Sequence, residues 1–331
     1  MINQIDLNAL QKGDSVDHFL ILKKIEIRKA KNGKDYLSLE LGDRSMNVNS
    51  NIWDNFESIN KNYKVGDIVK IIGTMDDYQG VPQLKIAQIK PVSENDDVNA
   101  SDFFMKSKRD IELMKKEFND RIENISNVSL KTLIKNIFNE VNFEKFINSP
   151  AGKSWHHAYV HGLIEHTLEI IKICDLMADI HPEINRDLLI SGAMMHDFGK
   201  TEELSVDASF SYTDKGKLVG HIVIAAMIIN DETGKIKNFP EELKNNLLHI
   251  VLSHQGKLEF ASPVIPKTLE AITLYQADEL SAKVNAYKNA LGSEIKGDSN
   301  WTRFIALAGT DLYRADLDNE NNDLPNKSLF D

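Results

Sequence analysis

The sequence contains a single cysteine, Cys174, among its 331 residues, so no disulfide can form within the chain. No apolar run approaches the roughly 20 residues that a membrane-spanning helix needs. The first residues lack the basic and apolar regions of a signal peptide. These absences predict a cytoplasmic protein with no membrane contact. Cys174 lies in an apolar helical run, which favours a packed side chain over a nucleophile.

Positive charge is also scarce. The chain has 39 Lys and Arg against 50 Asp and Glu, a net charge of −11. Residues 12–92 carry slightly more basic than acidic side chains, so the acidic surplus lies in the rest of the chain. Some of those acids are candidate metal ligands, whose charge a bound cation offsets. Charge alone therefore neither establishes nor excludes nucleic-acid binding.

The N-terminal part of the sequence predicts a β-barrel. Segments rich in β-branched and aromatic residues, bounded by turn signals, predict five short strands. They cover residues 19–27, 36–41, 46–53, 65–73 and 83–89. Asn32-Gly33 is a hairpin turn signal, and residues 54–60 can form a short helix between the third and fourth strands. This order is typical of an OB-fold barrel.

An OB-fold that binds single strands stacks bases on aromatic side chains and contacts phosphates with basic ones. The candidate stacking residues are Tyr36, Trp53 and Tyr78. The candidate phosphate contacts are Lys34, Arg44 and Lys85. The alternative is that Trp53 packs at the barrel edge and the basic side chains are merely solvated. OB-folds also serve protein–protein contacts.

The most informative motif is His196-Asp197, within S-G-A-M-M-H-D-F-G-K at residues 191–200. An imidazole beside a carboxylate suits divalent metals that accept nitrogen and oxygen ligands. One such dipeptide is common by chance, but further candidates occur in or beside apolar helical runs. They are His166, His221, His254 and Asp278. Burying so many polar groups is costly unless metal or hydrogen bonds satisfy them.

The order H, HD, H, H, D resembles the HD superfamily of metal-dependent phosphohydrolases. The resemblance implies an all-α bundle in which each ligand is held by a different helix. It also implies two divalent ions, with Mn favoured among Fe, Zn, Mg, Co and Ni. One ion would take His166, His196, Asp197 and Asp278. The other would take His221 and His254, with Asp197 bridging, and such a pair activates water and neutralises charge at phosphorus.

Lys200 follows Asp197 by three residues, which predicts the same helix face one turn on. It is the second catalytic candidate beside Asp197 and a candidate contact for a phosphate oxygen, although a solvated lysine is the alternative. His157 and His161 have i, i+4 helical spacing, a geometry known for metal pairs. Because His166 better matches the first ligand of the family, they are assigned to substrate binding, together with Lys153.

These features divide the chain into a multidomain α+β protein, an OB-fold barrel followed by an HD helical bundle. An N-terminal segment (1–13) and the OB-fold nucleic-acid-binding domain (14–92) come first. Linker and connecting helices (93–147) precede the HD phosphohydrolase domain (148–314), in which residues 207–218 predict a β-turn excursion near the site. The acidic, Asn-rich tail (315–331) is expected to be disordered.

The combination resembles the YhaM-type 3′-to-5′ exoribonucleases of Gram-positive bacteria. The resemblance lies in G-V-P-Q-L-K-I, P-A-G-K-S-W-H-H-A-Y-V-H-G-L-I-E-H-T, H-D-F-G-K and L-S-H-Q-G. The chain departs from the usual family pattern at Gly152, Trp155 and Gln255. The resemblance implies a Mn-favouring enzyme that degrades single-stranded RNA, and also single-stranded DNA, from the 3′ end to nucleoside 5′-monophosphates.

Two other functions stay open. HD domains also serve as nucleotide or cyclic-nucleotide phosphohydrolases, although a mononucleotide needs no strand-tracking barrel. A nonenzymatic nucleic-acid-binding replication factor is the second alternative, which the complete ligand set argues against. The sequence leaves a homo-oligomer open.

Overall fold

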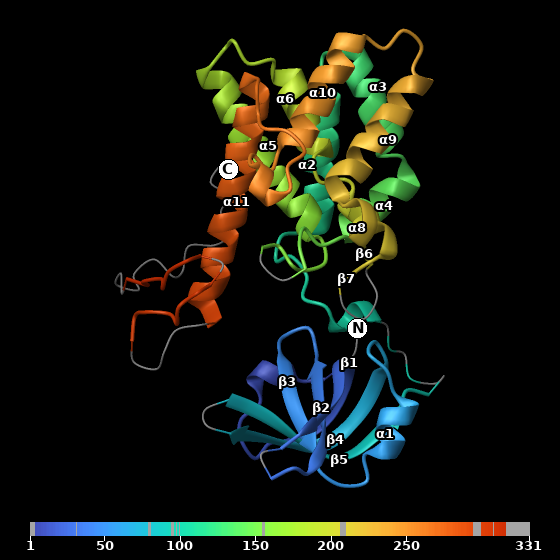
Figure 1. Cartoon of the computed structure of the whole chain (residues 1–331), viewed down its shortest axis with the longest axis vertical. Coiled ribbons are helices and arrows are strands. Elements are labelled where there is room, and N and C mark those ends of the chain that lie inside the picture. Colours follow the sequence, from blue (N-terminus) through green and yellow to red (C-terminus); the bar gives the residue numbers. More distant parts are fainter. Residues whose placement is uncertain are drawn as a thin grey trace.

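The computed structural model describes residues 4–30, 32–78, 81–93, 96, 98, 100–153, 156–205, 210–293, 299–306 and 308–315. A β-barrel lies at one end of the molecule and a helical bundle at the other (Figure 1). The predicted fold class, a barrel followed by an all-α bundle, is confirmed. The predicted disordered tail falls almost entirely outside the described residues, and the predicted domain boundaries stay predictions.

The barrel is closed, with neighbouring strands in the order β1-β2-β3-β5-β4. The strands are β1 (Ser15–Lys29), β2 (Asp35–Gly42), β3 (Asn47–Ile52), β4 (Ile68–Tyr78) and β5 (Val81–Pro91). Helix α1 (Glu57–Asn62) lies between β3 and β4, as the sequence predicts. All pairings are antiparallel except that of β3 with β5, which closes the barrel.

Alternation along the strands fills the barrel interior. Leu37, Leu39 and Leu41 of β2 are fully buried, and the intervening side chains are more exposed. The short 3-10 helix η1 (Leu7–Ala9) adds Leu7 to the same core. Gly73 sits where the pairing of β4 with β5 shifts register, and a Cβ there would lie 2.2 Å from the carbonyl oxygen of Lys85. Only glycine allows that close approach.

The helical bundle begins after the 3-10 helix η2 (Ala100–Phe103). Its first helices are α2 (Ile111–Glu123), α3 (Val128–Ile137), α4 (Glu140–Asn148), α5 (Gly162–Ile180), α6 (Arg186–Met195) and α7 (Lys200–Glu203). Its later helices are α8 (Asp214–Val219), α9 (His221–Lys235), α10 (Glu241–Ser253), η3 (Leu258–Phe260) and α11 (Leu269–Ser293).

Side-chain caps fix several helix starts. Asp110, Asn127, Asn139 and Asn185 each accept backbone N–H groups from the first turn of the helix that follows. Such caps satisfy donors that have no partner within the helix. Helices α2 to α4 share one hydrophobic core with α5, α6, α9, α10 and α11. The packing unit that carries the candidate ligands therefore begins well before residue 148.

The segment predicted as a β-turn excursion, residues 207–218, is only partly of that kind. Strands β6 (Leu204–Ser205) and β7 (Ser211–Tyr212) form a small antiparallel pair. Residues 214–219 are then helical, because Thr213 caps α8 through the amide of Gly216. Residues 206–209 lie outside the described part. None of the described helices is long and apolar enough to span a membrane.

The barrel and the bundle meet through an apolar cluster. Ile21 of β1, Phe103 and Phe104 after the barrel, and Val160 before α5 are all buried together. A bridge between Lys106 and Val160 runs alongside. The barrel is thus packed against the bundle as well as covalently joined to it.

Candidate functional site

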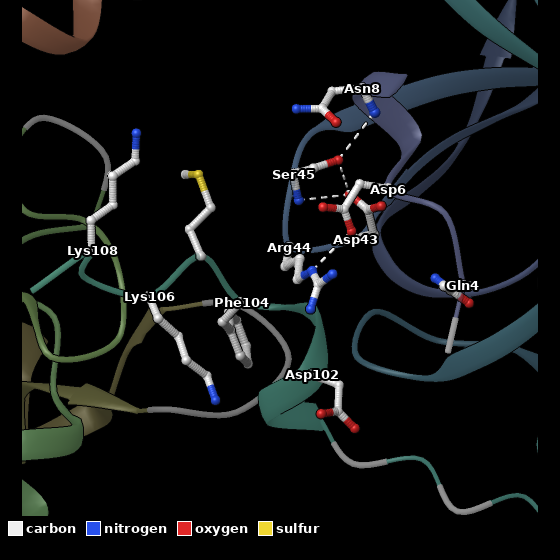
Figure 2. A pocket seen from close by; sticks show the side chains of 11 residues that line it. Gln4, Asp6, Asn8, Asp43, Arg44, Ser45, Asp102, Phe104, Lys106 and Lys108 are labelled. Atoms are coloured by element: carbon white, nitrogen blue, oxygen red, sulfur yellow. Dashed lines mark hydrogen bonds and ion pairs between the residues drawn. The ribbon is translucent and has the colours of Figure 1, made fainter. Parts of the chain in front are cut away.

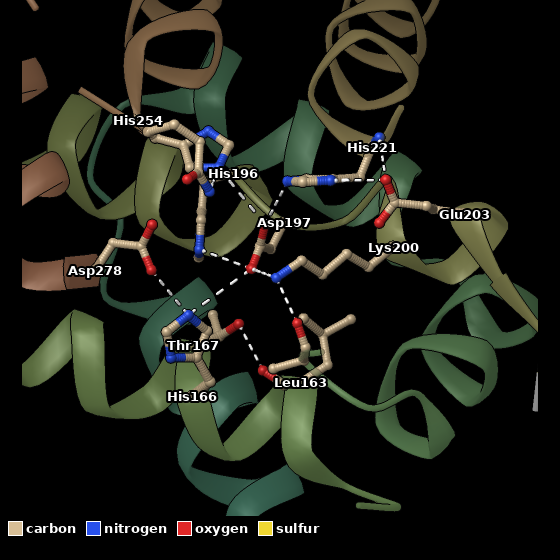
Figure 3. Close-up of polar contacts among 12 residues, drawn as sticks. Leu163, His166, Thr167, His196, Asp197, Lys200, Glu203, His221, His254 and Asp278 are labelled. Atoms are coloured by element: carbon tan, nitrogen blue, oxygen red, sulfur yellow. Dashed lines mark hydrogen bonds and ion pairs between the residues drawn. The ribbon is translucent and has the colours of Figure 1, made fainter. Parts of the chain in front are cut away.

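The six predicted metal ligands come together from five helices and the turn after α6, as Figure 3 shows. His166 lies on α5, and His196 ends α6. Asp197 follows in the next turn. His221 opens α9, His254 ends α10 and Asp278 lies on α11. Apart from His221, whose side chain is 17% exposed, these side chains are at most about one-eighth exposed.

Asp197 lies at the centre, and its two carboxylate oxygens face different groups. Oδ2 is 3.3 Å from His196 Nε2 and 3.7 Å from His166 Nε2, and His166 Nε2 is 3.0 Å from Asp278 Oδ1. Oδ1 is 3.4 Å from His221 Nε2 and 3.6 Å from His254 Nε2. Two groups of donor atoms within 4.8 Å result, and they share Asp197. This is the division that the HD resemblance implies.

The other ring nitrogen of each histidine is held by a fixed partner. His196 Nδ1 lies 2.8 Å from the carbonyl oxygen of Ala193, and His254 Nδ1 lies 2.6 Å from that of Val251. A carbonyl oxygen can only accept, so both rings donate from Nδ1 and direct Nε2 toward the centre. Glu203 holds His221 Nδ1 at 2.9 Å, and the Ser281 hydroxyl holds His166 Nδ1 at 3.0 Å.

Glu203 and Ser281 could not be predicted from the sequence, because their roles depend on tertiary contacts. Glu203 also accepts the backbone N–H of His221. The one available signal was the position of Glu203, one turn after Lys200.

The inward-facing atoms fit a divalent cation. Within the described residues, His166 Nε2, His196 Nε2, His221 Nε2 and Asp197 Oδ1 are buried and have no hydrogen-bond partner. Such groups are costly to bury unless something binds them. Four imidazole nitrogens with two carboxylates form a ligand set that suits Mn²⁺, Fe²⁺ or Zn²⁺ better than Ca²⁺.

Burial and neighbouring charges shift the pKa values of the candidate ligands in opposite directions. Burial raises the pKa of Asp197, but Lys200 and His196 outweigh it, so this pKa lies well below its usual range. Burial lowers the pKa of His166 and of His254, which keeps both rings neutral. Neutral imidazoles and an ionised carboxylate are the forms that bind metal.

Lys200 reaches the centre, but not along a continuous helix as predicted. Helix α6 ends at Met195, residues 196–199 form a turn, and α7 starts at Lys200. A Cβ on Gly199 would lie 2.1 Å from the carbonyl oxygen of His221, so the turn packs directly on the start of α9. Lys200 Nζ lies 2.6 Å from Asp197 Oδ2 and also donates to the carbonyl oxygen of Ala151. Contact with a phosphate stays a prediction.

His157 and His161 do not share a helix, although their i, i+4 spacing would allow it. Both residues have positive φ, 42° and 68°, in the loop before α5. His161 stands at the N-cap position of α5, and its Nδ1 lies 2.6 Å from the carbonyl oxygen of Ile147. His157 is fully buried on the Nδ1 side of His166, beside Glu169. Lys153 is exposed and lies over the Tyr212 ring.

A small pocket of about 190 Å³ opens on the centre. Its lining includes His156, Lys200, His254, Gln255, Tyr275 and Lys283. His156, rather than His157 or His161, thus faces the pocket. Burial lowers the pKa of His156 to about 2, so this ring is neutral at physiological pH. Gly256 has φ 75°, and a Cβ there would lie 2.2 Å from the Tyr275 ring, so glycine keeps the tyrosine at the pocket.

In the barrel, Tyr36 and Trp53 stack with ring centroids 4.7 Å apart. Trp53 is 43% exposed and Tyr78 is 62% exposed. The three predicted phosphate contacts are all ion-paired: Lys34 with Asp54, Arg44 with Asp6, and Lys85 with Asp76. Their positive charge is therefore largely balanced within the barrel.

A larger hollow of about 550 Å³ lies between the barrel and the segment that leads to the bundle. Figure 2 shows Arg44 on the barrel side and Lys106 and Lys108 on the opposite side. Lys106 and Lys108 are exposed, and no acidic side chain of the described residues forms an ion pair with either. These two lysines are cations that the sequence analysis did not single out.

Comparison with known proteins finds two family models, one for each part of the fold. The HD domain family model matches residues 163–283, and the OB-fold nucleic acid binding domain model matches residues 23–92. The chain is 34% identical over 302 residues to the 3'-5' exoribonuclease YhaM of Bacillus subtilis. It is 36% identical over 301 residues to the proteins of that name from Listeria welshimeri and Listeria monocytogenes. Each match covers 91% of this chain and 95% of the relative.

The predicted resemblance is thereby confirmed over nearly the whole length of both chains. Both family models fall on the two parts of the fold described above, and the HD match includes all six candidate ligands. The chain belongs to the family of the 3'-5' exoribonuclease YhaM.

Proposed function

We propose that this protein is a divalent-metal-dependent 3′-to-5′ exoribonuclease that hydrolyses single-stranded RNA to nucleoside 5′-monophosphates. The observation that carries the proposal is the pair of donor groups that share Asp197, next to a pocket lined by Lys200, His254 and Asp278. The direction of digestion is taken from the names of the relatives. The single buried cysteine agrees with a cytoplasmic location.

His166, His196, Asp197 and Asp278 would hold one ion, and His221 and His254 would hold a second one with Asp197. Bound divalent ions supply activation of water and neutralisation of charge at phosphorus. Glu203 and Ser281 keep the histidine rings in place, so little reorganisation is needed when the phosphate arrives. Mn²⁺ is the ion that the family resemblance favours, and an imidazole-rich ligand set suits transition metals better than Ca²⁺.

The pocket residues orient the terminal nucleotide. Lys200 carries a buried positive charge next to Asp197, where it can bind a non-bridging phosphate oxygen. The neutral His156 ring faces the pocket beside Lys200. Water loses a proton and attacks phosphorus, and the bond to the 3′ oxygen of the preceding nucleotide breaks. That oxygen takes up a proton from the solvent, and the phosphate stays on the 5′ carbon of the released nucleotide. The 2′-hydroxyl takes no part, so single-stranded DNA should also be cut.

The barrel and the inter-domain hollow would hold the rest of the strand. Tyr36 and Trp53 form an exposed aromatic pair on which bases can stack. Lys106 and Lys108 are free to meet phosphates at the hollow, midway along the chain between the barrel and the bundle. A nucleotide phosphohydrolase would need neither feature.

The test is a time course with a single-stranded RNA labelled at its 5′ end, using protein stripped of metal and resupplied with Mn²⁺ or Ca²⁺. The proposal expects a ladder that shortens step by step, unlabelled 5′-monophosphates, and activity with Mn²⁺ far above that with Ca²⁺. Immediate release of a labelled mononucleotide would instead mean digestion from the 5′ end. Products with 2′,3′-cyclic ends would mean attack by the 2′-hydroxyl, and equal activity with Ca²⁺ would contradict a nitrogen-rich centre.

A further inference from the structure

A second cluster of potential ligands lies behind the HD centre, on the Nδ1 side of His166. It consists of His157, Glu165 and Glu169, whose donor atoms all lie within 4.8 Å of one another. None of the three belongs to the ligand set of the HD motif. The cluster is separated from that set by the His166 ring, whose Nε2 faces Asp278 and Asp197.

His157 brings a buried ring with unmet hydrogen-bonding capacity to this cluster. The residue is 0% exposed, and neither ring nitrogen has a hydrogen-bond partner within the described structure. Nε2 lies 3.3 Å from Glu169 Oε2. A fully buried imidazole in this state is costly unless a further group binds it.

The backbone around His157, by contrast, is fully anchored. Its N–H donates to Asn285 Oδ1 at 2.9 Å, and its carbonyl oxygen accepts from the amides of Ala151 and Tyr159. The residue has φ 42°, and a Cβ on Gly162 would lie 2.0 Å from its carbonyl oxygen. A strained conformation that neighbours hold this firmly is common at functional sites. Here it aims the ring at two carboxylates.

Glu165 and Glu169 lie one turn apart on the same face of α5. Glu165 Oε2 is buried and, among the described residues, has no hydrogen-bond partner. Glu169 Oε2 accepts the Ser281 hydroxyl at 2.7 Å, and its side chain remains 38% exposed. The carboxylates therefore retain free lone pairs, and the exposed edge leaves room for water ligands.

We propose that His157, Glu165 and Glu169 bind a third divalent cation, separate from the HD centre. Metal–ligand bonds of about 2.0–2.2 Å place neighbouring donors roughly 3–4 Å apart, so a small inward shift completes the site. One imidazole and two carboxylates suit Mn²⁺, Fe²⁺ or Zn²⁺. The ion would tie the loop that carries Ala151 and His156 to α5.

The site also connects to the HD centre without sharing a ligand. Glu169 accepts the Ser281 hydroxyl, and that hydroxyl meets His166 Nδ1. An ion on Glu169 would fix the orientation of Ser281 and, through it, the His166 ring. The proposal does not depend on nuclease activity, because it predicts only an additional bound cation.

The test counts Mn²⁺ per chain after equilibrium dialysis of the full-length, chelator-stripped protein. Glu165→Gln keeps the size of the side chain and removes its charge, and it should bind one ion fewer than the wild type. His157→Asn should show the same loss. Asp179→Asn is the control, because Asp179 is exposed at the end of the same helix, and its count should equal the wild-type count.

The variant Asp197→Asn distinguishes ions bound at the HD centre from the ion bound at the third site. Adding Glu165→Gln to Asp197→Asn should remove one further ion, whatever the HD centre binds in that background. Melting curves establish that each variant is folded. Equal counts in the wild type and in both Glu165→Gln and His157→Asn would overturn the third site. A normal Asp197→Asn count would instead count against the HD assignment and leave the third site supported.

Discussion

Asp197 faces more of the other candidate ligands than any other side chain of the site does. It is 2% exposed, faces four imidazoles and lies 2.6 Å from Lys200. Its charge is held by Lys200 and the histidines against an unfavourable burial. Replacing it therefore changes both the ligand set and a buried ion pair.

Asp197→Asn should reduce the rate of RNA hydrolysis by several orders of magnitude, because an amide cannot supply the shared negative ligand. Single-turnover digestion of an end-labelled RNA measures the loss. The variant should still bind single-stranded RNA, because the barrel is remote from this residue. Near wild-type turnover would remove Asp197 from the catalytic assignment.

Gly199→Ala should displace the start of α9, since the new Cβ would lie 2.1 Å from the carbonyl oxygen of His221. We expect a loss of about 1–3 kcal/mol in the free energy of unfolding, together with weaker metal binding, because His221 would move away from Asp197. Denaturant melts and metal titration measure the two effects. The control is Gly234→Ala in α9, where a Cβ meets nothing within 4 Å and should stabilise the helix slightly.

Cys174 should act as an internal reporter of unfolding. Burial raises the pKa of its thiol, and the side chain is 0% exposed in the core of α5. Reaction with a thiol reagent at pH 8 should therefore require opening of the bundle. Labelling should be absent in the folded protein and rapid in denaturant, and fast labelling without denaturant would contradict the packing described.

At the scale of the elements, three of the six candidate ligands lie at helix ends, whereas His166 and Asp278 lie within helices and Asp197 lies in a turn. His196 and His254 are the residues at which α6 and α10 stop, and His221 is the first residue of α9. In the barrel, a candidate base-stacking residue also lies at the end of an element. Trp53 follows β3 directly and stacks on Tyr36 of β2.

Trp53→Ala should weaken binding of single-stranded RNA by about 5- to 100-fold, the range expected when one base loses an aromatic partner. Fluorescence anisotropy with a labelled oligonucleotide measures the change. Ile27→Ala, an exposed apolar side chain on the same barrel, provides the matched control. If both variants bind equally well, the aromatic pair serves the barrel rather than the RNA.

Local patterns predicted the elements better than their junctions. The five strands, the helix after β3 and the positions of His221 and His254 at helix ends were all predictable, because alternation and apolar periodicity are local signals. The break after Met195 was not, since the packing of Gly199 on α9 decides it. The loop geometry of His157 and the partners Glu203 and Ser281 depend on contacts far apart in the sequence.

At the scale of the whole molecule, the apolar cluster of Ile21, Phe103, Phe104 and Val160 joins the two parts. A linker of this length could otherwise allow independent motion. The hollow lined by Lys106 and Lys108 lies beside this cluster, and Phe104 of the cluster forms part of its wall.

Phe104→Ala should slow digestion of long RNA more than that of a trinucleotide, because it loosens the junction and leaves the HD centre intact. Comparison of kcat/KM for the two substrates measures the effect. Phe118→Ala is the control, because Phe118 is fully buried in the bundle core and its loss should impair both substrates alike. Equal losses with Phe104→Ala would mean that the junction is needed only for folding.

The fixed junction has a consequence for the lengths of the products. If the barrel cannot move relative to the HD centre, the distance between them sets the shortest RNA that can contact both at once. An RNA longer than this distance occupies both ends at once, whereas a shorter one must release the barrel to place its 3′ end at the metal ligands. Digestion is then expected to pause at one characteristic residual length, the same for every sequence, and to leave short oligonucleotides for other nucleases to finish.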